Sequence, residues 1–119
     1  MVNTSKAIQS LWKGKCTVLV REERKNSVTK RIEFDETTLL KDEPCRLSIK
    51  NMPPASGLAD AAVANQMIKL FILPQHIIPA GSKIIVSQNG VTNIYTRSSA
   101  PAVYTNHQEI VLELFSGWL

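Results

Sequence analysis

The chain has 119 residues, a formal net charge of +4, 44% hydrophobic residues and 20% charged residues. This composition is typical of a globular domain and excludes a disordered chain. No apolar run approaches the roughly 20 residues that cross a bilayer, and the N-terminus lacks the apolar stretch of a signal peptide. We therefore expect one domain over residues 1–119, made in the cytoplasm and without contact to a membrane.

The charge is distributed unevenly along the chain. Residues 1–31 carry a net charge of +6, residues 32–60 carry −3, and the remainder carries +1. Such polarity suits a protein that meets a charged surface, or that associates with copies of itself head to tail. The alternative is a basic hairpin that is simply solvated.

The first expected element is a short helix over residues 4–12. Its apolar residues, Ala7, Ile8, Leu11 and Trp12, form one stripe at helical spacing, and Gly14 ends it. A helix this short is marginal in water, so we expect the N-terminal helical segment of residues 1–14 to dock on the domain or on a neighbour.

Apolar and polar residues alternate after Gly14, which indicates β-strands. We expect a strand over residues 16–21, a polar hairpin tip over 22–27 and a returning strand over 28–34. A loop is expected at 41–44, before a strand at 45–50.

Residues 51–65 break this alternation with two prolines followed by small side chains, and they predict a long inserted loop. Long loops in compact domains are usually functional, although a crossover without a role is the alternative. The candidate loop residues are Asn51, Met52, Pro53, Pro54, Gly57, Asp60 and Asn65.

The second half of the chain predicts four further strands. They cover residues 66–73, 83–88, 92–97 and 107–115, with an Asn89-Gly90 hairpin turn between the second and third. The fold class is therefore all-β, a small β-barrel or sandwich of about seven mostly antiparallel strands over residues 15–115.

No catalytic constellation is recognisable in the sequence. His107 is expected at the start of a strand, and His76 lies between prolines in a loop that we expect to face solvent. A zinc site from Cys16, Cys45 and the two histidines would lack the close ligand pairs of known sites, and both cysteines fit core positions. We expect neither an enzyme nor a cofactor or metal.

Nucleic-acid binding is the second function that the sequence suggests. The candidate interface or DNA-contact residues are Trp12, Lys13, Lys15, Arg21, Arg24, Lys25, Lys30 and Arg31. Aromatic residues are not interleaved with this basic set, so base stacking is not indicated. A non-specific electrostatic contact with nucleic acid stays open.

Several segments resemble the small minor capsid or head–tail joining proteins of phages and prophages of Gram-positive bacteria, most closely those of the PBSX-type elements of Bacillus. These segments are LWKGKCTVLVREE, KDEPCRLSI, IKLFILP, PAGSKIIVSQNG and YTNHQEIVLELF. They span most of residues 11–115, and no single motif among them is diagnostic.

The resemblance implies a structural, non-enzymatic role in the virion. Proteins of this kind are small β-barrels that form a head-completion or stopper ring between the portal-adaptor side and the tail side of the phage neck. The implied partners are other neck proteins, further copies of the chain, and packaged DNA through a non-specific contact. The loop at residues 51–65 corresponds by its position to the channel-facing insertion of such proteins.

Overall fold

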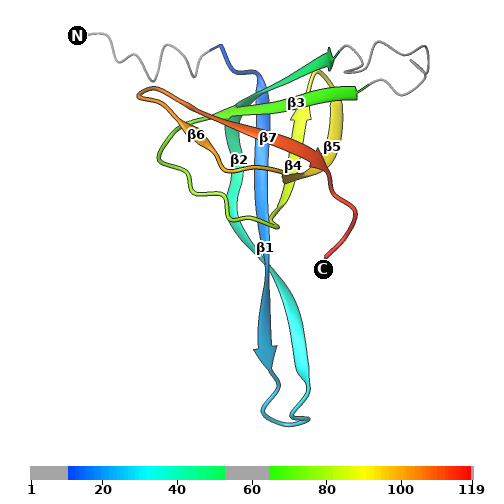
Figure 1. Ribbon diagram of the computed structural model, residues 1–119. Coiled ribbons are helices and arrows are strands. Elements are labelled where there is room, and N and C mark those ends of the chain that lie inside the picture. The colour runs from blue at the N-terminus through cyan, green and yellow to red at the C-terminus, as the bar shows by residue number, and fades with distance from the viewer. Residues whose placement is uncertain (1–10, 53–64, 119) are drawn as a thin grey trace.

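The computed structural model describes residues 11–52 and 65–118, which form one antiparallel seven-stranded sheet (Figure 1). The strands are β1 (Gly14–Lys25), β2 (Ile32–Met52), β3 (Asn65–Ile72), β4 (Lys83–Gln88), β5 (Val91–Arg97), β6 (Ala102–Val103) and β7 (Gln108–Leu114). The expected all-β class with seven antiparallel strands is confirmed. No helix occurs in the described ranges, and hence none that is long and apolar enough to cross a membrane.

The sheet returns on itself. Its order is β3-β2-β1-β4-β5-β7-β6, and β3 also pairs with β7 from Ile68↔Leu112 to Ile72↔Gln108. Six strands therefore follow one another in a closed circuit of pairings. Within residues 11–52 and 65–118, the short strand β6 pairs only with β7, and it lies outside this circuit.

Alternating side chains of these strands fill a common core. Its buried members are Cys16, Val18, Cys45, Leu70, Ile72, Ile78, Ile84, Val86, Tyr95, Ile110 and Leu112. Over residues 14–18 of β1, 83–86 of β4 and 108–112 of β7 every second residue is buried, as the period of a strand with one covered face requires. The core positions expected for Cys16 and Cys45 are confirmed, because neither side chain is exposed.

The expected loop at residues 41–44 is wrong, because these residues belong to the 21-residue strand β2. The pairing with β1 shifts between Cys16 and Val18 and again between Val18 and Leu19, so β2 contains one extra residue at each place. Asp42 takes the left-handed conformation there (φ 51°), and its N–H donates to Thr17 Oγ1 at 3.2 Å. Two β-bulges thus interrupt the alternation that the sequence pattern relies on.

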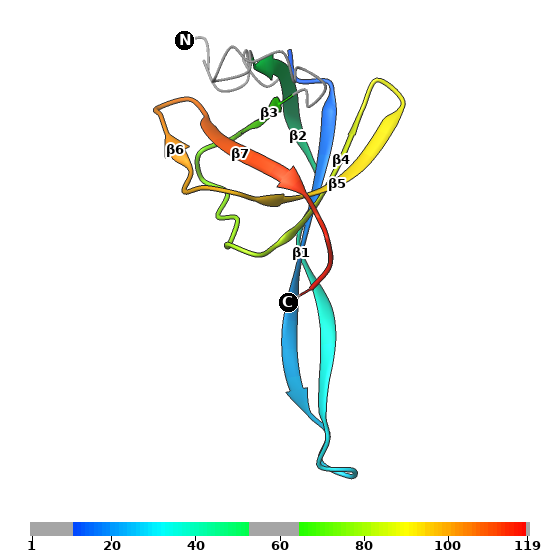
Figure 2. The same ribbon diagram turned by 45° about the vertical axis from the view of Figure 1, so that its right-hand side comes forward.

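Beyond these bulges, β1 and β2 leave the other strands and continue as a two-stranded ribbon, visible in Figures 1 and 2. We call residues 20–37 the arm and the remaining described residues the body. The hairpin tip expected at residues 22–27 is misplaced, because β1 runs to Lys25 and β2 begins at Ile32. The turn therefore occupies residues 26–31, and the strand expected from residue 28 begins four residues later.

Two expected elements fall largely outside the described residues. The helix at residues 4–12 lies mostly in the range 1–10, and Leu11 and Trp12, which are described, are not helical. Of the loop expected at 51–65, Asn51 and Met52 end β2 and Asn65 begins β3, so these three residues belong to strands. The connection is therefore confined to residues 53–64, which lie outside the described part of the chain.

Candidate interaction site

The arm ends in a turn whose backbone groups are hydrogen-bonded. Asn26 organises it, because its side-chain oxygen accepts the N–H groups of Val28 at 2.8 Å and Thr29 at 3.2 Å. The Lys30 N–H donates to the Asn26 carbonyl at 2.8 Å, and Lys30 has a φ of 59°. The turn places the basic side chains of Lys25, Lys30 and Arg31 at the far end of the arm.

The arm brings the basic and acidic stretches of the sequence together. Arg24 lies 2.8 Å from Glu33 and 3.1 Å from Asp35, and Asn26 donates to Glu33 at 3.1 Å. The hydrogen bond from Asn26, followed by that from Arg24, lowers the pKa of Glu33. Residues 20–37 contain five Lys or Arg and five Asp or Glu, so the arm as a whole has no net charge.

Both faces of the arm are open to solvent, because it consists of only two strands. Paired residues of antiparallel strands share a face, so Ile32 and Phe34 lie on the same face as Lys25, Glu23 and Arg21. Ile32 is 62% exposed and Phe34 is 49% exposed. The Arg21 guanidinium lies 3.6 Å from the centre of the Phe34 ring, a cation–π contact.

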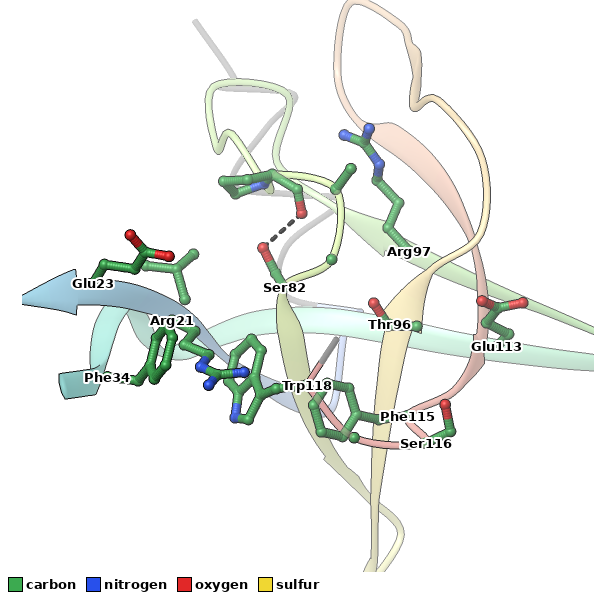
Figure 3. Close-up of a pocket in the computed structure, with 15 residues that line it drawn as sticks. Arg21, Glu23, Phe34, Ser82, Thr96, Arg97, Glu113, Phe115, Ser116 and Trp118 are labelled. Atoms are coloured by element: carbon green, nitrogen blue, oxygen red, sulfur yellow. Dashed lines mark hydrogen bonds between the residues drawn. The ribbon is translucent and has the colours of Figure 1, made fainter. Parts of the chain in front are cut away.

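A pocket of about 600 Å³ lies where the arm joins the body, and Figure 3 shows the side chains around it. It is lined by Val20, Arg21, Glu23 and Phe34 of the arm, by residues 79–82 before β4, by Thr96, Arg97 and Glu113, and by residues 115–118 of the C-terminal tail. Its walls thus combine aromatic rings with charges of both signs.

The C-terminal tail forms one side of this pocket and binds to Glu36 of the arm. The Trp118 indole N–H donates to Glu36 Oε1 at 3.0 Å, and Lys83 Nζ lies 3.4 Å from the same oxygen. The Trp118 hydrogen bond, followed by that from Lys83, lowers the pKa of Glu36. Phe115 packs edge-on against Trp118 with 5.2 Å between ring centroids, so the tail is an aromatic brace between the body and the arm.

The sequence interpretation did not include Phe34, Glu36, Phe115 or Trp118 among the candidate residues. The available signal was a pair of aromatic residues, Phe115 and Trp118, in a short segment after the last strand. Their contact with Glu36 spans 82 positions of sequence, and no local pattern indicates such a contact.

The structure does not bring the candidate basic residues onto one surface. Lys13 and Lys15 lie on either side of Gly14, the first residue of β1, whereas Lys25, Lys30 and Arg31 lie at the arm's tip. Lys25 follows Lys15 by ten positions along the strand, a distance of about 33 Å at the usual rise. Arg21 contacts Phe34, and Arg24 contacts two acids of β2. The set is thus divided between two ends of the strand.

The two histidines lie apart from this pocket. His107 stacks on Tyr104 with 4.9 Å between ring centroids, and its Nε2 lies 3.2 Å from Glu109. That contact with His107, followed by the charge of Lys69, lowers the pKa of Glu109. A smaller pocket of about 400 Å³ lies beside His107 and includes Trp12.

The expectation that His76 faces solvent is wrong. Only 15% of its side chain is exposed, and its Nε2 is buried 3.4 Å from Glu43, without hydrogen-bond geometry. The buried amide of Gln108 fixes this segment, because it donates to the carbonyls of Leu73 at 2.8 Å and His76 at 2.5 Å.

Cys16 and Cys45 are free thiols in the core. Their mutual hydrogen bond, together with burial, raises the pKa of Cys16 well above that of an ordinary thiol. Over residues 11–52 and 65–118, no three His, Cys, Asp or Glu side chains gather in a way that could hold a metal ion. The zinc alternative thus finds no cluster in this part of the chain.

Comparisons with known proteins show a fold rather than a family. No protein family model matches the chain, and no curated protein matches it. A solved structure, that of the phage-like element PBSX protein xkdH from Bacillus subtilis, is similar with a TM-score of 0.51 and 12% sequence identity. The match covers 84% of this chain and 91% of that one. At this level of identity it shows a shared fold.

Proposed function

We propose that the chain is a structural component of a phage-type neck, a subunit of a head-completion or stopper ring that joins head and tail. The observation that carries this proposal is the likeness of fold to a protein of a phage-like element, which extends over most of both chains. The segments that resemble head–tail joining proteins of PBSX-type elements support the same assignment. We further propose that the protein acts without catalysis, and that it resides in the virion.

The shape of the sheet supports a role in assembly. The closed circuit of six strands supports the barrel alternative of the expected fold, with a core that needs no partner to be covered. β2 begins in the arm and ends at Met52, and its end lies on the side of the body away from the arm (Figure 1). We assign the channel-facing role to the connection between β2 and β3, and the contacts with neighbours to the arm.

Deletion of the coding region from the phage or prophage that encodes it tests this proposal. We expect particles that package DNA but lose it and lack tails, because the exit channel is neither closed nor prepared for docking. Expression of the protein in trans should restore both properties, and electron microscopy should then show a ring in the neck. Particles that retain DNA and attach tails without the protein would refute the proposal.

Contact with DNA remains a secondary proposal. It is restricted to the tip residues Lys25, Lys30 and Arg31, for which no ion pair occurs among the described side chains. Binding to random oligonucleotides should weaken steeply with salt, because neutralised phosphates release counterions. An unchanged affinity after Lys30→Glu and Arg31→Glu would exclude the tip as the contact.

A further inference from the structure

The arm has two open strand edges. β1 pairs with β4 only from Lys15 to Leu19, and β2 pairs with β3 only from Arg46 to Met52. In the described part of the chain, residues 22–25 and 32–35 therefore have a strand neighbour on one side only. The opposite side of each strand offers backbone N–H and C=O groups for pairing with another strand.

An isolated two-stranded ribbon is marginally stable in water, and a third strand usually makes such a structure stable. The arm also carries exposed apolar side chains, because Val28 is 88% exposed and Ile32 is 62% exposed. A strand added to either edge would cover part of this surface. The arm thus has the features of an element that is completed by a neighbour.

The two edges differ in charge. Residues 20–25, the β1 part of the arm, carry three Lys or Arg and two Glu, a net charge of +1, and the turn adds Lys30 and Arg31. Residues 32–37 of β2 carry Glu33, Asp35 and Glu36 without a basic residue, a net charge of −3. Charged side chains on an exposed edge strand ordinarily prevent it from pairing with other strands, and edges that all carried one sign would keep all copies of the chain apart. Here a β1 edge repels another β1 edge and a β2 edge repels another β2 edge, whereas a β1 edge attracts a β2 edge.

We propose that the β1 edge of one arm pairs with the β2 edge of the arm of a second copy. If copies surround an axis with their arms pointing the same way, β1 of each copy lies beside β2 of the next. These strands run in opposite directions, as do all paired strands in the sheet. Because the two contact surfaces differ, the contact repeats from copy to copy and closes into a ring when the rotation permits. The inference rests on the ring proposed above and names its surfaces.

Charge reversal on one edge at a time tests this pairing in the full-length protein. An acidic variant carries Arg24→Glu and Lys25→Glu, and a basic variant carries Glu33→Lys and Asp35→Lys. Each variant has two edges of the same sign, so we expect its self-association, measured by sedimentation velocity, to weaken about tenfold or more. An equimolar mixture of the two should regain association in alternating order.

The mixture separates contacts between copies from contacts within one copy. Both variants lose the Arg24–Glu33 and Arg24–Asp35 pairs inside the arm, and mixing cannot restore these pairs. A variant with all four substitutions regains them with reversed polarity, and it should associate as the wild type does. If the variant with all four substitutions recovers self-association and the mixture does not, the charges act within one arm, and the proposal is overturned.

Carbodiimide cross-linking provides a second readout, because it joins a lysine to a carboxylate in direct contact. A mixture of ¹⁴N-labelled and ¹⁵N-labelled wild-type protein should give mixed-isotope peptides that link Lys25 or Lys30 to Glu33, Asp35 or Glu36. Complete absence of mixed-isotope links at the highest soluble concentration would overturn the proposal. Links from the arm only to other proteins of the particle would also overturn it, in favour of a foreign strand on this edge.

A matched control reverses two exposed lysines on the body's part of β2, Lys41→Glu and Lys50→Glu, with the same change in net charge as the acidic variant. Its association should equal that of the wild type. DNA retention and tail attachment in particles that lack the protein are measured separately. Arms that pair in solution, combined with particles that need no such protein, would refute the proposed function and leave the pairing standing.

Discussion

The body and the arm share the strands β1 and β2, yet different interactions stabilise them. In the body, alternate residues such as Val18 and Leu70 are fully buried, and the circuit of pairings supplies neighbours on both sides of each strand. In the arm no residue has a core to enter, and the ribbon depends on the turn around Asn26, on Arg24 and on cross-strand pairs. The comparison teaches that the length of a strand does not reveal which interactions stabilise it, because a single strand can be packed in a core along one part and surrounded by solvent along the other.

Removal of core volume should give the largest difference between the two regions. Leu70→Ala deletes a fully buried side chain and should lower the free energy of unfolding by about 3 kcal/mol. Ile32→Ala on the arm should lower it by less than about 0.5 kcal/mol, as at other exposed sites. Urea denaturation measures both values, and equal losses would show that the arm is covered in the isolated protein.

A buried polar contact should have the next largest effect. Gln108→Ala removes the donor to the carbonyls of Leu73 and His76, leaves both without this partner, and should cost about 2 kcal/mol. Gln66→Ala is the matched control, because Gln66 is exposed and its amide is 3.4 Å from Asn51. A loss at Gln66 as large as that at Gln108 would contradict the assignment of this amide as the anchor of the segment.

Acidification should loosen the arm before the body. Folding lowers the pKa of Glu33, so its contribution is present above the ordinary pKa of about 4.3 and is lost as the pH falls through the folded-state value. Hydrogen-exchange protection factors of the arm amides should therefore fall below about pH 4, ahead of those around Leu70. Glu33→Gln should remove this pH dependence, and its persistence in that variant would exclude Glu33 as the cause.

The smallest expected effect concerns the brace between the tail and the arm. Trp118→Phe keeps a ring but removes the indole donor, so the pKa of Glu36 should rise toward its ordinary value in a carboxyl NMR titration. Lys83→Met should raise this pKa as well, because it removes both a hydrogen bond and a positive charge beside the same carboxylate. An unchanged pKa of Glu36 in the Trp118→Phe variant would show that the tail does not contact the arm in this way.

Sequence reasoning located the strands that obey simple alternation and the hairpin at Asn89-Gly90, where both residues have positive φ as a tight turn requires. It failed on β2, because each bulge adds one residue and reverses which residues face the core. Inward positions accordingly pass from Cys45 to Glu43, then to Leu40 and then to Thr37, spacings of two, three and three. This broken period was interpreted as a loop.

The candidate site was less accessible from the sequence than the fold. Charge patterning identified Arg24, Lys25, Lys30 and Arg31, but it could not show that Arg24 meets Glu33 and Asp35 across the hairpin. The pocket where the arm joins the body depends on contact between the tail and residues more than 80 positions earlier in the sequence, such as Glu36. Contacts of this kind arise from the closure of the whole sheet and have no local signature.

The two extra residues of β2 also determine which side chains the arm shows to each side. With both present, Ile32 and Phe34 share a face with Arg21, and Glu33 and Asp35 share a face with Arg24. A chain one residue shorter between Thr38 and Glu43 would move every β2 side chain of the arm to the opposite face, while the pairing of β2 with β3 kept its register. Single-residue insertions and deletions here, provided that Leu40 keeps its place against the core, would therefore change the side chains that the arm presents to a partner.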